Sequence, residues 1–483
     1  MHPFARTFHF FATLLLASVA VMSAAQPGAP DVSFDPGSGA NSTVYAIAMQ
    51  GDRILIGGDF TTMDGAVRGL IARLEEDGEL DGTFDPGSGF SGGAFPTVLC
   101  MIPLPEDKVL VSGAFTEFAG VERSGIARLN ADGSLDTSFD PGSGSSFGHV
   151  TSTALAPDGN VVLAGGFSSY NGIPRDGLAR IHADGTLDPS FDPAALLSGY
   201  STSALVQPDG RILVAISRDN KDLTTHANVH RLNADGTLDP AFNIGSGSTG
   251  GFTTAIRTMA LQPDGKILLG GTFGQFHGVN AVNLIRLNAD GTVDLGFSTV
   301  SGPEGRVEDL AVQPDGRILL AGQFTTFAGY ERRWVARTQT NGELDLSFDP
   351  GEGANSYLYS VALQGADKAL LGGPFATYAG ADWSKIARIH CDQGTAMRAS
   401  IAREQELSIS PNPATQQIVI RTSLSGLVHA VIVDGAGRCV RRTSRAAVHD
   451  QGIRLEVDDL PAGTYLLSIQ SSAGVQRGVF VRE

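Results

Sequence analysis

Hydrophobic and polar positions alternate along most of this chain in short runs that are separated by turn sequences. The fullest example is 261–297, which reads LQPDGKILLGGTFGQFHGVNAVNLIRLNADGTVDLGF. Pro and Asp suit the centre of a tight turn and Gly accepts a positive φ, so 262–265 and 288–291 predict hairpin turns. The period-2 pattern around them predicts four strands. These are expected at 256–261, 266–272, 282–287 and 293–297.

Variants of this stretch recur along the chain with a period of about 50 to 56 residues. An Asp-x-x-Phe element appears seven times, and a Gly-Gly-x-Phe element recurs as often, with a degenerate fourth copy. The phenylalanines of the first element are Phe34, Phe84, Phe139, Phe191, Phe242, Phe297 and Phe348. A fixed period with several short strands in each unit is typical of a propeller or a solenoid. The sequence therefore predicts an all-β fold, a seven-bladed β-propeller of four-stranded blades over 26–394.

Within each unit an arginine is expected to face an aspartate across the second hairpin. The spacing is eight residues in Arg73/Asp81, Arg128/Asp136, Arg180/Asp188, Arg231/Asp239, Arg286/Asp294 and Arg337/Asp345. With a three-residue loop at 131–133, Arg128 lies opposite Asp136, and the same register places Arg286 opposite Asp294. Directly opposed residues share one face of a sheet, so each hairpin is predicted to carry a cross-strand ion pair.

The last arginine of the series, Arg388, has no aspartate eight residues later. The chain begins with an orphan fourth strand at 31–36, which has no arginine of its own. We therefore predict that this N-terminal strand pairs beside 385–390, with Asp31 facing Arg388. Such pairing closes the ring and removes its open edge.

The two ends of the chain differ from the repeats. Residues 1–25 have a basic start, an apolar run and small residues near Ala25, the pattern of a secretory signal peptide that is removed. A stretch without repeat signals, 395–406, predicts a linker. Beyond it, 407–483 alternates in strands such as 417–421 and predicts a small β-sandwich. No other run is long enough to span a bilayer, so the mature chain is expected to lack a transmembrane segment.

Composition narrows the classes of partner. The chain has 42% hydrophobic and 18% charged residues, which is typical of a globular protein with a large core. Its net charge of -17 argues against nucleic acid as a partner, because phosphate binding requires a basic face. The three cysteines, Cys100, Cys391 and Cys439, allow at most one disulfide, so disulfides are not expected to organise the fold.

Two families resemble parts of this sequence. The elements QPDGKIL, GGTF and RLNADGTLDPSFDPGSG resemble the delta-60 β-propeller repeat across about 26–394. The C-terminal part resembles the type A sorting domain of the type IX secretion system, through 410–413 (SPNP), 434–438 (DGAGR) and 460–465 (LPAGTY). The second resemblance implies export across the outer membrane, removal of the domain, and release or attachment at the surface of a Bacteroidota-type bacterium.

No P-loop, HExxH motif, nucleophile elbow or dinucleotide fingerprint is present. Residues that recur in every unit are expected to be structural, so no catalytic residue, cofactor or metal ligand is assigned. Two alternatives stay open. Calcium could bind at the recurring Asn-x-Asp-Gly-x-x-Asp turns, which also suit a hairpin. His226 and His230 would share a strand face and could form a metal pair, but no third ligand is evident, and an inserted loop in a degenerate blade is the favoured explanation.

A set of aromatic residues follows the Gly-Gly-x-Phe element by three or four positions. Its members are Phe118, Tyr170, Phe276, Phe327 and Tyr378. A ring of aromatic side chains on one propeller face could stack on sugars or hold a peptide, whereas packing between blades is the structural alternative. The function predicted is a secreted or cell-surface binding propeller with a glycan or protein ligand. The competing class is a propeller hydrolase or lyase with a site on one face.

Overall fold

The computed structural model describes residues 26–146, 149–193, 201–216, 227–243, 245–249, 254–297, 302–392, 408–421, 426–434, 439–447, 453–471 and 474–483. The chain divides into two compact units, Met1–Gln393 and Gly394–Glu483, and each is described by itself. Every regular element of the described residues is a β-strand. Within those ranges, no apolar helix of bilayer-spanning length occurs. The predicted signal peptide and the linker at 395–406 lie outside the described residues.

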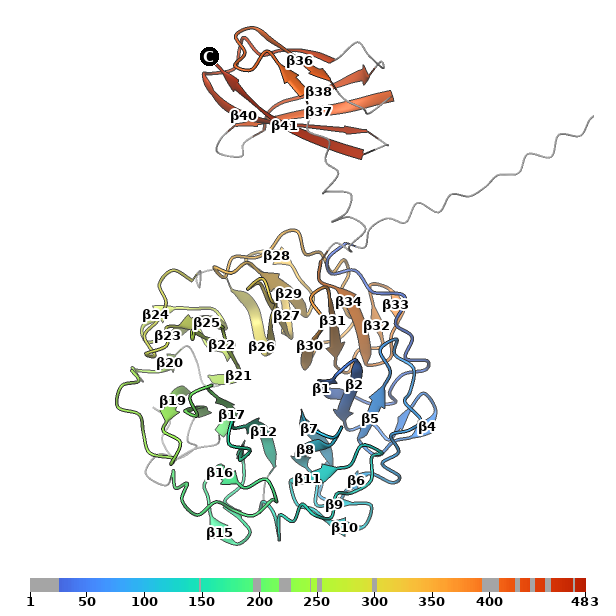
Figure 1. Cartoon of the computed structure of the whole chain (residues 1–483), viewed down its shortest axis with the longest axis vertical. Coiled ribbons are helices and arrows are strands. Elements are labelled where there is room, and N and C mark those ends of the chain that lie inside the picture. Colours follow the sequence, from blue (N-terminus) through green and yellow to red (C-terminus); the bar gives the residue numbers. More distant parts are fainter. Residues whose placement is uncertain are drawn as a thin grey trace, which may run out of the picture. The chain divides into compact units, whose positions relative to one another are not determined.

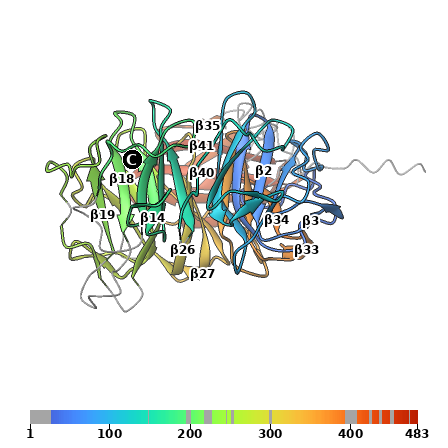
Figure 2. The same ribbon diagram turned by 90° about the horizontal axis from the view of Figure 1, so that it is seen from below.

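The first unit is built from antiparallel sheets that follow one another along the chain, each with three main strands. Figure 1 shows them arranged around a common centre, with the first strand of each sheet innermost, and Figure 2 shows the strands running between the two faces of the unit. The sheets are β1 (Val44–Gln50), β2 (Arg53–Gly58) and β5 (Ile71–Leu74); β7 (Thr97–Pro103), β8 (Val109–Ala114) and β11 (Ile126–Leu129); β12 (Val150–Leu155), β13 (Val161–Gly165) and β16 (Leu178–Ile181); β17 (Ser201–Val206), β18 (Ile212–Ile216) and β19 (Asn228–Leu232); β21 (Ala255–Leu261), β22 (Ile267–Thr272) and β25 (Leu284–Leu287); β26 (Pro303–Val312), β27 (Ile318–Phe327) and β29 (Val335–Thr338); and β30 (Ser360–Gln364), β31 (Lys368–Gly372) and β34 (Ile386–His390).

Short strands of two residues form small ladders between the second and third strands of the sheets. They are β3 (Thr62–Met63), β4 (Ala66–Val67), β9 (Glu117–Phe118), β10 (Val121–Glu122), β14 (Ser169–Tyr170), β15 (Ile173–Pro174), β23 (Gln275–Phe276), β24 (Val279–Asn280), β28 (Tyr330–Glu331), β32 (Thr377–Tyr378) and β33 (Ala381–Asp382). Two further short strands, β6 (Phe90–Ser91) and β20 (Ser248–Thr249), pair with β9 and β23. In the sheet of β26, β27 and β29, β28 adds a short fourth strand.

The prediction of a fourth strand in each unit is wrong. In the fifth unit only Val293 pairs, through a single bridge to Leu287, and a turn follows. The reason is the Asp-x-x-Phe element itself. Oδ1 of Asp294 accepts a hydrogen bond from the Gly296 amide, and the Phe297 amide donates to the Asp294 carbonyl at 3.1 Å. A side chain that bonds its own backbone two residues on favours a turn over a strand.

The core of the first unit lies within the sheets and between neighbouring ones. One cluster joins Val44 and Ile56 of the first sheet to Leu371 and Ile389 of the last. Neighbouring sheets approach so closely that a Cβ added at Gly57 would lie 2.4 Å from a methyl carbon of Val98. Packing between sheets therefore requires glycine at this position.

The N-terminal segment lies beside the last sheet. Pro30 forms a bridge with Ile389, the Asp31 amide donates to the Arg388 carbonyl at 2.7 Å, and the Gly28 amide donates to the His390 carbonyl at 2.7 Å. The pairing therefore runs through residues 28–31, somewhat earlier than the predicted 31–36. From Asp31 onward the chain turns, because the Phe34 amide donates to the Asp31 carbonyl.

The second unit consists of two antiparallel sheets around one core. The first contains β35 (Ser408–Ser410), β36 (Gln417–Arg421) and β39 (Ile453–Glu456). The second has the order β38 (Cys439–Ala447), β37 (Gly426–Asp434), β40 (Gly463–Ser471) and β41 (Gly474–Arg482). Ile418 and Leu455 from one sheet share a core with Ile432, Leu467 and Phe480 from the other. This is the arrangement of a small β-sandwich.

Candidate functional site

The predicted arginine–aspartate partners lie within hydrogen-bonding distance. Nε of Arg128 donates to Oδ2 of Asp136 at 2.8 Å, and Nε of Arg286 donates to Oδ2 of Asp294 at 2.8 Å. Nε of Arg388 donates to Oδ2 of Asp31, also at 2.8 Å. Burial alone would raise the pKa of Asp31, but hydrogen bonds from Ser33, together with Lys368 and Arg388, hold it well below its usual range.

Each of these arginines also lies over the phenylalanine of an Asp-x-x-Phe element. The guanidinium of Arg128 is 5.1 Å from the centre of the Phe139 ring, and that of Arg388 is 4.9 Å from the centre of the Phe34 ring. This cation–π contact explains why arginine, aspartate and phenylalanine recur together. The eight-residue spacing predicts the ion pair but not the stacking, although the constant position of the phenylalanine three residues after the aspartate carries that signal.

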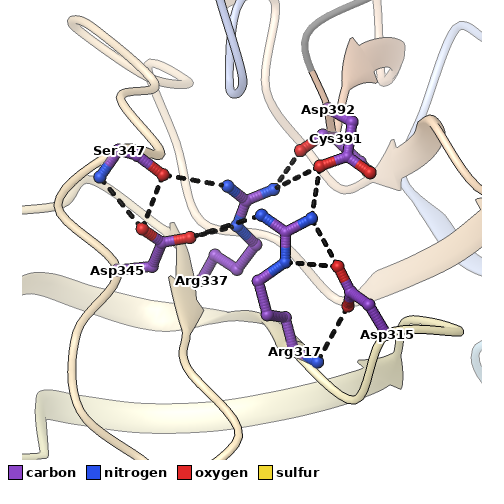
Figure 3. Close-up of polar contacts among 7 residues, drawn as sticks. All are labelled: Asp315, Arg317, Arg337, Asp345, Ser347, Cys391 and Asp392. Atoms are coloured by element: carbon purple, nitrogen blue, oxygen red, sulfur yellow. Dashed lines mark hydrogen bonds and ion pairs between the residues drawn. The ribbon is translucent and has the colours of Figure 1, made fainter. Parts of the chain in front are cut away.

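The arginines also connect neighbouring sheets. Nη1 of Arg286 donates to the Thr340 carbonyl at 2.7 Å, and Nη1 of Arg337 donates to the Cys391 carbonyl. Figure 3 shows Arg337 between Asp345 and Cys391, with Arg317 beside it bridging Asp315 and Asp392. These contacts hold the sheets together, and their buried groups are not accessible to a ligand.

The five aromatic residues proposed to bind ligand are buried, and this corrects the binding hypothesis for them. Phe118, Tyr170, Phe276, Phe327 and Tyr378 have exposed fractions of 0 to 2%. The hydroxyl of Tyr378 donates to the Gly28 carbonyl at 2.8 Å, and that of Tyr170 donates to the Gly185 carbonyl at 2.8 Å. Both tyrosines thereby satisfy their polar atoms within the core. Packing between sheets is their role, because none offers a ring face to a ligand.

The described residues provide no set of metal ligands for either the calcium hypothesis or the histidine-pair hypothesis. Oδ1 of Asp132 accepts hydrogen bonds from both the amide and the hydroxyl of Ser134, so this turn carboxylate is engaged in its own hairpin. His230 is half-buried in β19, where burial lowers its pKa, and His226 lies outside the described residues. Across the ranges that the structure covers, no group of three His, Cys, Asp or Glu residues is placed to hold a metal ion.

A different group of four aromatic residues is partly exposed, and these four residues lie together in one region of the first unit. The rings of Trp334 and Tyr357 are 6.4 Å apart, those of Tyr357 and Tyr359 are 5.3 Å apart, and those of Tyr359 and Tyr45 are 4.6 Å apart. We call Trp334, Tyr357, Tyr359 and Tyr45 the aromatic row. It links the sheet of β26, β27 and β29 to the last sheet and to the first.

The aromatic row begins at an open cavity of about 680 Å³. Trp334 lines this cavity, together with Thr326, Glu331, Arg333 and Asn355. Nε of Arg333 donates to Oε1 of Glu331 at 2.7 Å. The cavity thus combines one aromatic ring with hydroxyl, amide and charged groups, and its lining is more polar than that of a typical small-molecule site.

The innermost strands bring further polar residues close to the aromatic row. Glu308 is the extra residue of a β-bulge in β26, and Tyr45 holds the same position in β1. Oε1 of Glu308 accepts hydrogen bonds from Gln323 at 3.0 Å and from Arg306 at 3.2 Å. Burial and the neighbouring Tyr357 raise the pKa of Tyr359, and the charge of Glu308 adds to this effect. Tyr359 therefore remains a neutral phenol at physiological pH.

Asp309, the residue after this bulge, ties two sheets together. Its Oδ2 accepts a hydrogen bond from the Val361 amide at 2.9 Å, and its Oδ1 accepts one from the Leu310 amide at 2.9 Å. Burial raises its pKa to about 6. Ser152 makes the equivalent contact between the third and fourth sheets, because its Oγ accepts a hydrogen bond from the Ala204 amide at 3.2 Å. Asp309 is thus a charged version of a recurring structural contact.

Sequence reasoning missed the aromatic row because its members come from different repeats and from irregular positions. One signal was available. Trp334 stands where other units have Leu70, Gly125, Gly177, Asn283 and Lys385, so an aromatic residue at this variable position distinguishes its unit from those.

Comparison with known families identifies both parts of the chain. Six segments match the domain of unknown function DUF5122, a beta-propeller, at residues 50–84, 105–139, 156–191, 207–242, 262–297 and 313–348. Residues 408–481 match the secretion system C-terminal sorting domain. The chain therefore carries DUF5122 beta-propeller repeats and a type IX sorting domain, and the sorting domain marks it as secreted or attached to the cell surface.

Several solved structures are similar to the chain at low identity. PorZ, a surface component of the type-IX secretion system of Porphyromonas gingivalis, is 13% identical with a TM-score of 0.45, over 94% of this chain and 61% of that one. A quinonprotein alcohol dehydrogenase-like protein of Bacteroides thetaiotaomicron is 11% identical with a TM-score of 0.34, over 74% and 67%. AztD of Citrobacter koseri is 10% identical with a TM-score of 0.32, over 84% and 98%. This chain thus spans less than two thirds of PorZ. No curated protein matches it.

Proposed function

We propose that the chain is a non-catalytic binding propeller, exported through the type IX system, which holds an extracellular glycan or protein at the aromatic row and the adjoining cavity. The observation that carries this proposal is asymmetry. Buried arginines, aspartates and phenylalanines recur from sheet to sheet, whereas among the described residues the aromatic row occurs once. A binding site on a repeat scaffold is expected where the repeat is broken, because the scaffold itself is explained by its recurring contacts.

The proposal includes a closed ring of seven blades. Its support is that the contacts between the last and first sheets are of the same kind as those between other neighbours. Nη1 of Arg388 donates to the Glu76 carbonyl, as Nη1 of Arg286 does to that of Thr340. Asp31 supplies the carboxylate that the last unit lacks. A closed ring would place the aromatic row on a rigid frame, so little ordering entropy would be lost on binding.

The alternative of a hydrolase or lyase has one feature in its favour, the raised pKa of Asp309, because perturbed carboxyl groups are frequent in active sites. However, its Oδ2 accepts a hydrogen bond from the Val361 amide of the last sheet, and its Oδ1 accepts one from the Leu310 amide of its own strand β26. A group held in this way joins two sheets. The hydroxyls of Thr258 and Ser360 beside it belong to the same structural network, since Oγ of Ser360 accepts a hydrogen bond from the Ile47 amide at 3.2 Å. We therefore propose that the chain does not catalyse a reaction.

The test is a binding screen of the full chain, immobilised through an introduced tag, against a glycan array and a panel of extracellular proteins. Hydrolysis of the same glycans and of casein is assayed in parallel with and without a chelator. The expected result is saturable binding without turnover. Turnover that depends on the protein would overturn the non-catalytic assignment, and the absence of any saturable partner would overturn the binding assignment.

A further inference from the structure

A buried glutamine precedes the first hairpin turn in five units of the repeat region. These residues, with exposed fractions of 2 to 8%, are Gln50, Gln207, Gln262, Gln313 and Gln364. The Gln364 side chain connects two sheets, because its Oε1 accepts a hydrogen bond from Nη1 of Arg388 at 3.0 Å and its Nε2 donates to the Glu76 carbonyl at 3.3 Å. Gln50 makes the corresponding contacts between the first and second sheets. The glutamine therefore fills the space between neighbouring sheets.

The second unit lacks this glutamine. Leu104 stands in its place, since the Leu104 amide makes the backbone hydrogen bond, at 2.8 Å, that the Gln262 amide makes in the fifth unit. Nη1 of Arg128 still donates to the Ala183 carbonyl of the third sheet. Leucine has no side-chain acceptor, so this nitrogen lacks the amide oxygen that the glutamine supplies in the first, fifth and last units. The Arg128 side chain is also the most exposed of its series, at 14% against 0 to 11%.

An open cavity of about 490 Å³ lies at this position, between the second and third sheets. The apolar side chains that form most of its wall are Leu104, Leu110, Phe139, Leu155, Pro157 and Val161. The charged side chains that line it are Glu106, Lys108 and Arg128. Pockets for small molecules usually have about 300 to 1,000 Å³ and mainly apolar walls with a few polar groups. The cavity meets this description, unlike the more polar one beside the aromatic row.

The charges at the cavity leave one positive charge uncompensated. Nε of Arg128 and Nζ of Lys108 contact the same oxygen of Asp136, at 2.8 and 3.2 Å. The other partner of Lys108 is Glu106 at 3.4 Å, but the Glu106 side chain is 79% exposed, so water screens that pair. The five units with the glutamine have a similar pair of cations at one aspartate, but there the glutamine fills the space beside it. An anionic group is therefore favoured in this cavity.

From the missing amide acceptor, the apolar wall and the excess of positive charge, we infer that this cavity binds a small carboxylate with an apolar body, such as a medium-chain alkanoate or an aryl alkanoate. The carboxylate takes the place of the glutamine amide and accepts hydrogen bonds from Nη1 of Arg128. The apolar body packs against Leu104 and Leu155. This site is separate from the aromatic row, and the inference does not depend on the proposed function.

The test is isothermal titration of the full chain with octanoate and phenylpropanoate, and with octanamide and phenylpropanamide as their uncharged counterparts. We expect at least one carboxylate to bind saturably, and about tenfold or more tighter than its amide, because a charge-assisted hydrogen bond is stronger than a neutral one. Leu104→Gln restores the glutamine and should weaken carboxylate binding about tenfold or more, since the new side chain occupies the site. Its melting temperature should not fall, because five other units carry glutamine at this position.

Two further variants complete the test. Leu155→Glu adds a negative charge to the cavity wall at a residue that is 41% exposed, so the fold should be kept while carboxylate binding weakens. Leu346→Gln is the matched control, because it makes the same substitution as Leu104→Gln at an exposed leucine of the sixth unit, and it should bind like the parent.

Three results would overturn the inference. If neither carboxylate binds saturably, the cavity is not a site for this class of ligand. Affinity that is unchanged in Leu104→Gln would place any binding elsewhere on the chain. Amides that bind as tightly as their acids would show that the positive charge selects nothing. None of these results bears on the glycan and protein screen, so failure here and failure of the proposed function are distinguishable.

Discussion

Nε of Arg388 donates a hydrogen bond to Oδ2 of Asp31 at 2.8 Å, although the two residues are 357 positions apart. The side chains are almost fully buried, with residue exposures of 2% and 4%. Lys368 adds a second cation 3.1 Å from the same carboxylate oxygen. The beginning and the end of the repeat region are therefore held together by the pair that elsewhere spans eight residues within one hairpin.

Removing the charge of Asp31 should destabilise the first unit strongly. Asp31→Asn leaves the buried guanidinium of Arg388 without its counter-ion, and breaking a buried pair in this way costs about 3 to 5 kcal/mol. Urea unfolding followed by tyrosine and tryptophan fluorescence measures the change. Asp132→Asn, in an exposed hairpin turn, is the control and should cost less than about 1 kcal/mol. Equal losses in the two variants would contradict a special role for the Asp31 contact.

Phe327 is expected to act in the core and not at a binding surface. It is 1% exposed and packs with Phe324 and Leu320, so Phe327→Ala should lower the free energy of unfolding by about 3 to 5 kcal/mol. Thermal and urea unfolding test this. If the variant instead melted like the parent and lost ligand affinity, the packing interpretation of these buried aromatics would have to be abandoned.

Asp309 should make stability depend on pH between about 4 and 6. Its pKa is about 6 in the folded chain and about 3.9 when unfolded, so the folded state holds its proton over that range. Folded-state stability is therefore greatest below pH 4 for this group and declines as pH rises, by about 2 to 3 kcal/mol at most.

The change that isolates this effect is Asp309→Ser, which adopts the solution used at Ser152. Chemical unfolding at pH 4, 5, 6 and 7 gives the difference between parent and variant, which cancels the contribution of histidines. The difference should shift in favour of the variant as pH rises. A difference that does not vary with pH would show that Asp309 ionises in the folded chain as it does in water.

The exported protein should lack its second unit. The sorting-domain match at 408–481 implies recognition by the type IX system, and removal of this domain is expected after export. Intact mass spectrometry of protein recovered from the medium or from the cell surface measures it. A mature chain that still ends at Glu483 would contradict removal of the domain. The same measurement checks whether residues 1–25 are absent.

Several features could be predicted because they depend on neighbours in sequence. The register that places Arg128 opposite Asp136 follows from a three-residue loop, and the Leu129–Leu135 bridge has the predicted register. The fourth strand could not be predicted, because its Asp-x-x-Phe element alternates like a strand while the aspartate side chain bonds the backbone ahead. Local hydrogen bonding overrode the hydrophobic pattern at that point.

The sequence by itself determined the repeat, the hairpins, the ion-pair register and the division into two parts, since each depends on short-range periodicity and turn chemistry. Only the tertiary structure decided which aromatic residues are buried and which form the aromatic row. Tyr378 and Tyr359 are 19 positions apart and equally aromatic, yet Tyr378 is enclosed between sheets and Tyr359 is partly exposed just before the innermost strand β30. Exposure depends on how closely neighbouring sheets pack. The distance between two sheets is set by contacts such as that of Gly57 with Val98, and no local sequence pattern specifies such a contact.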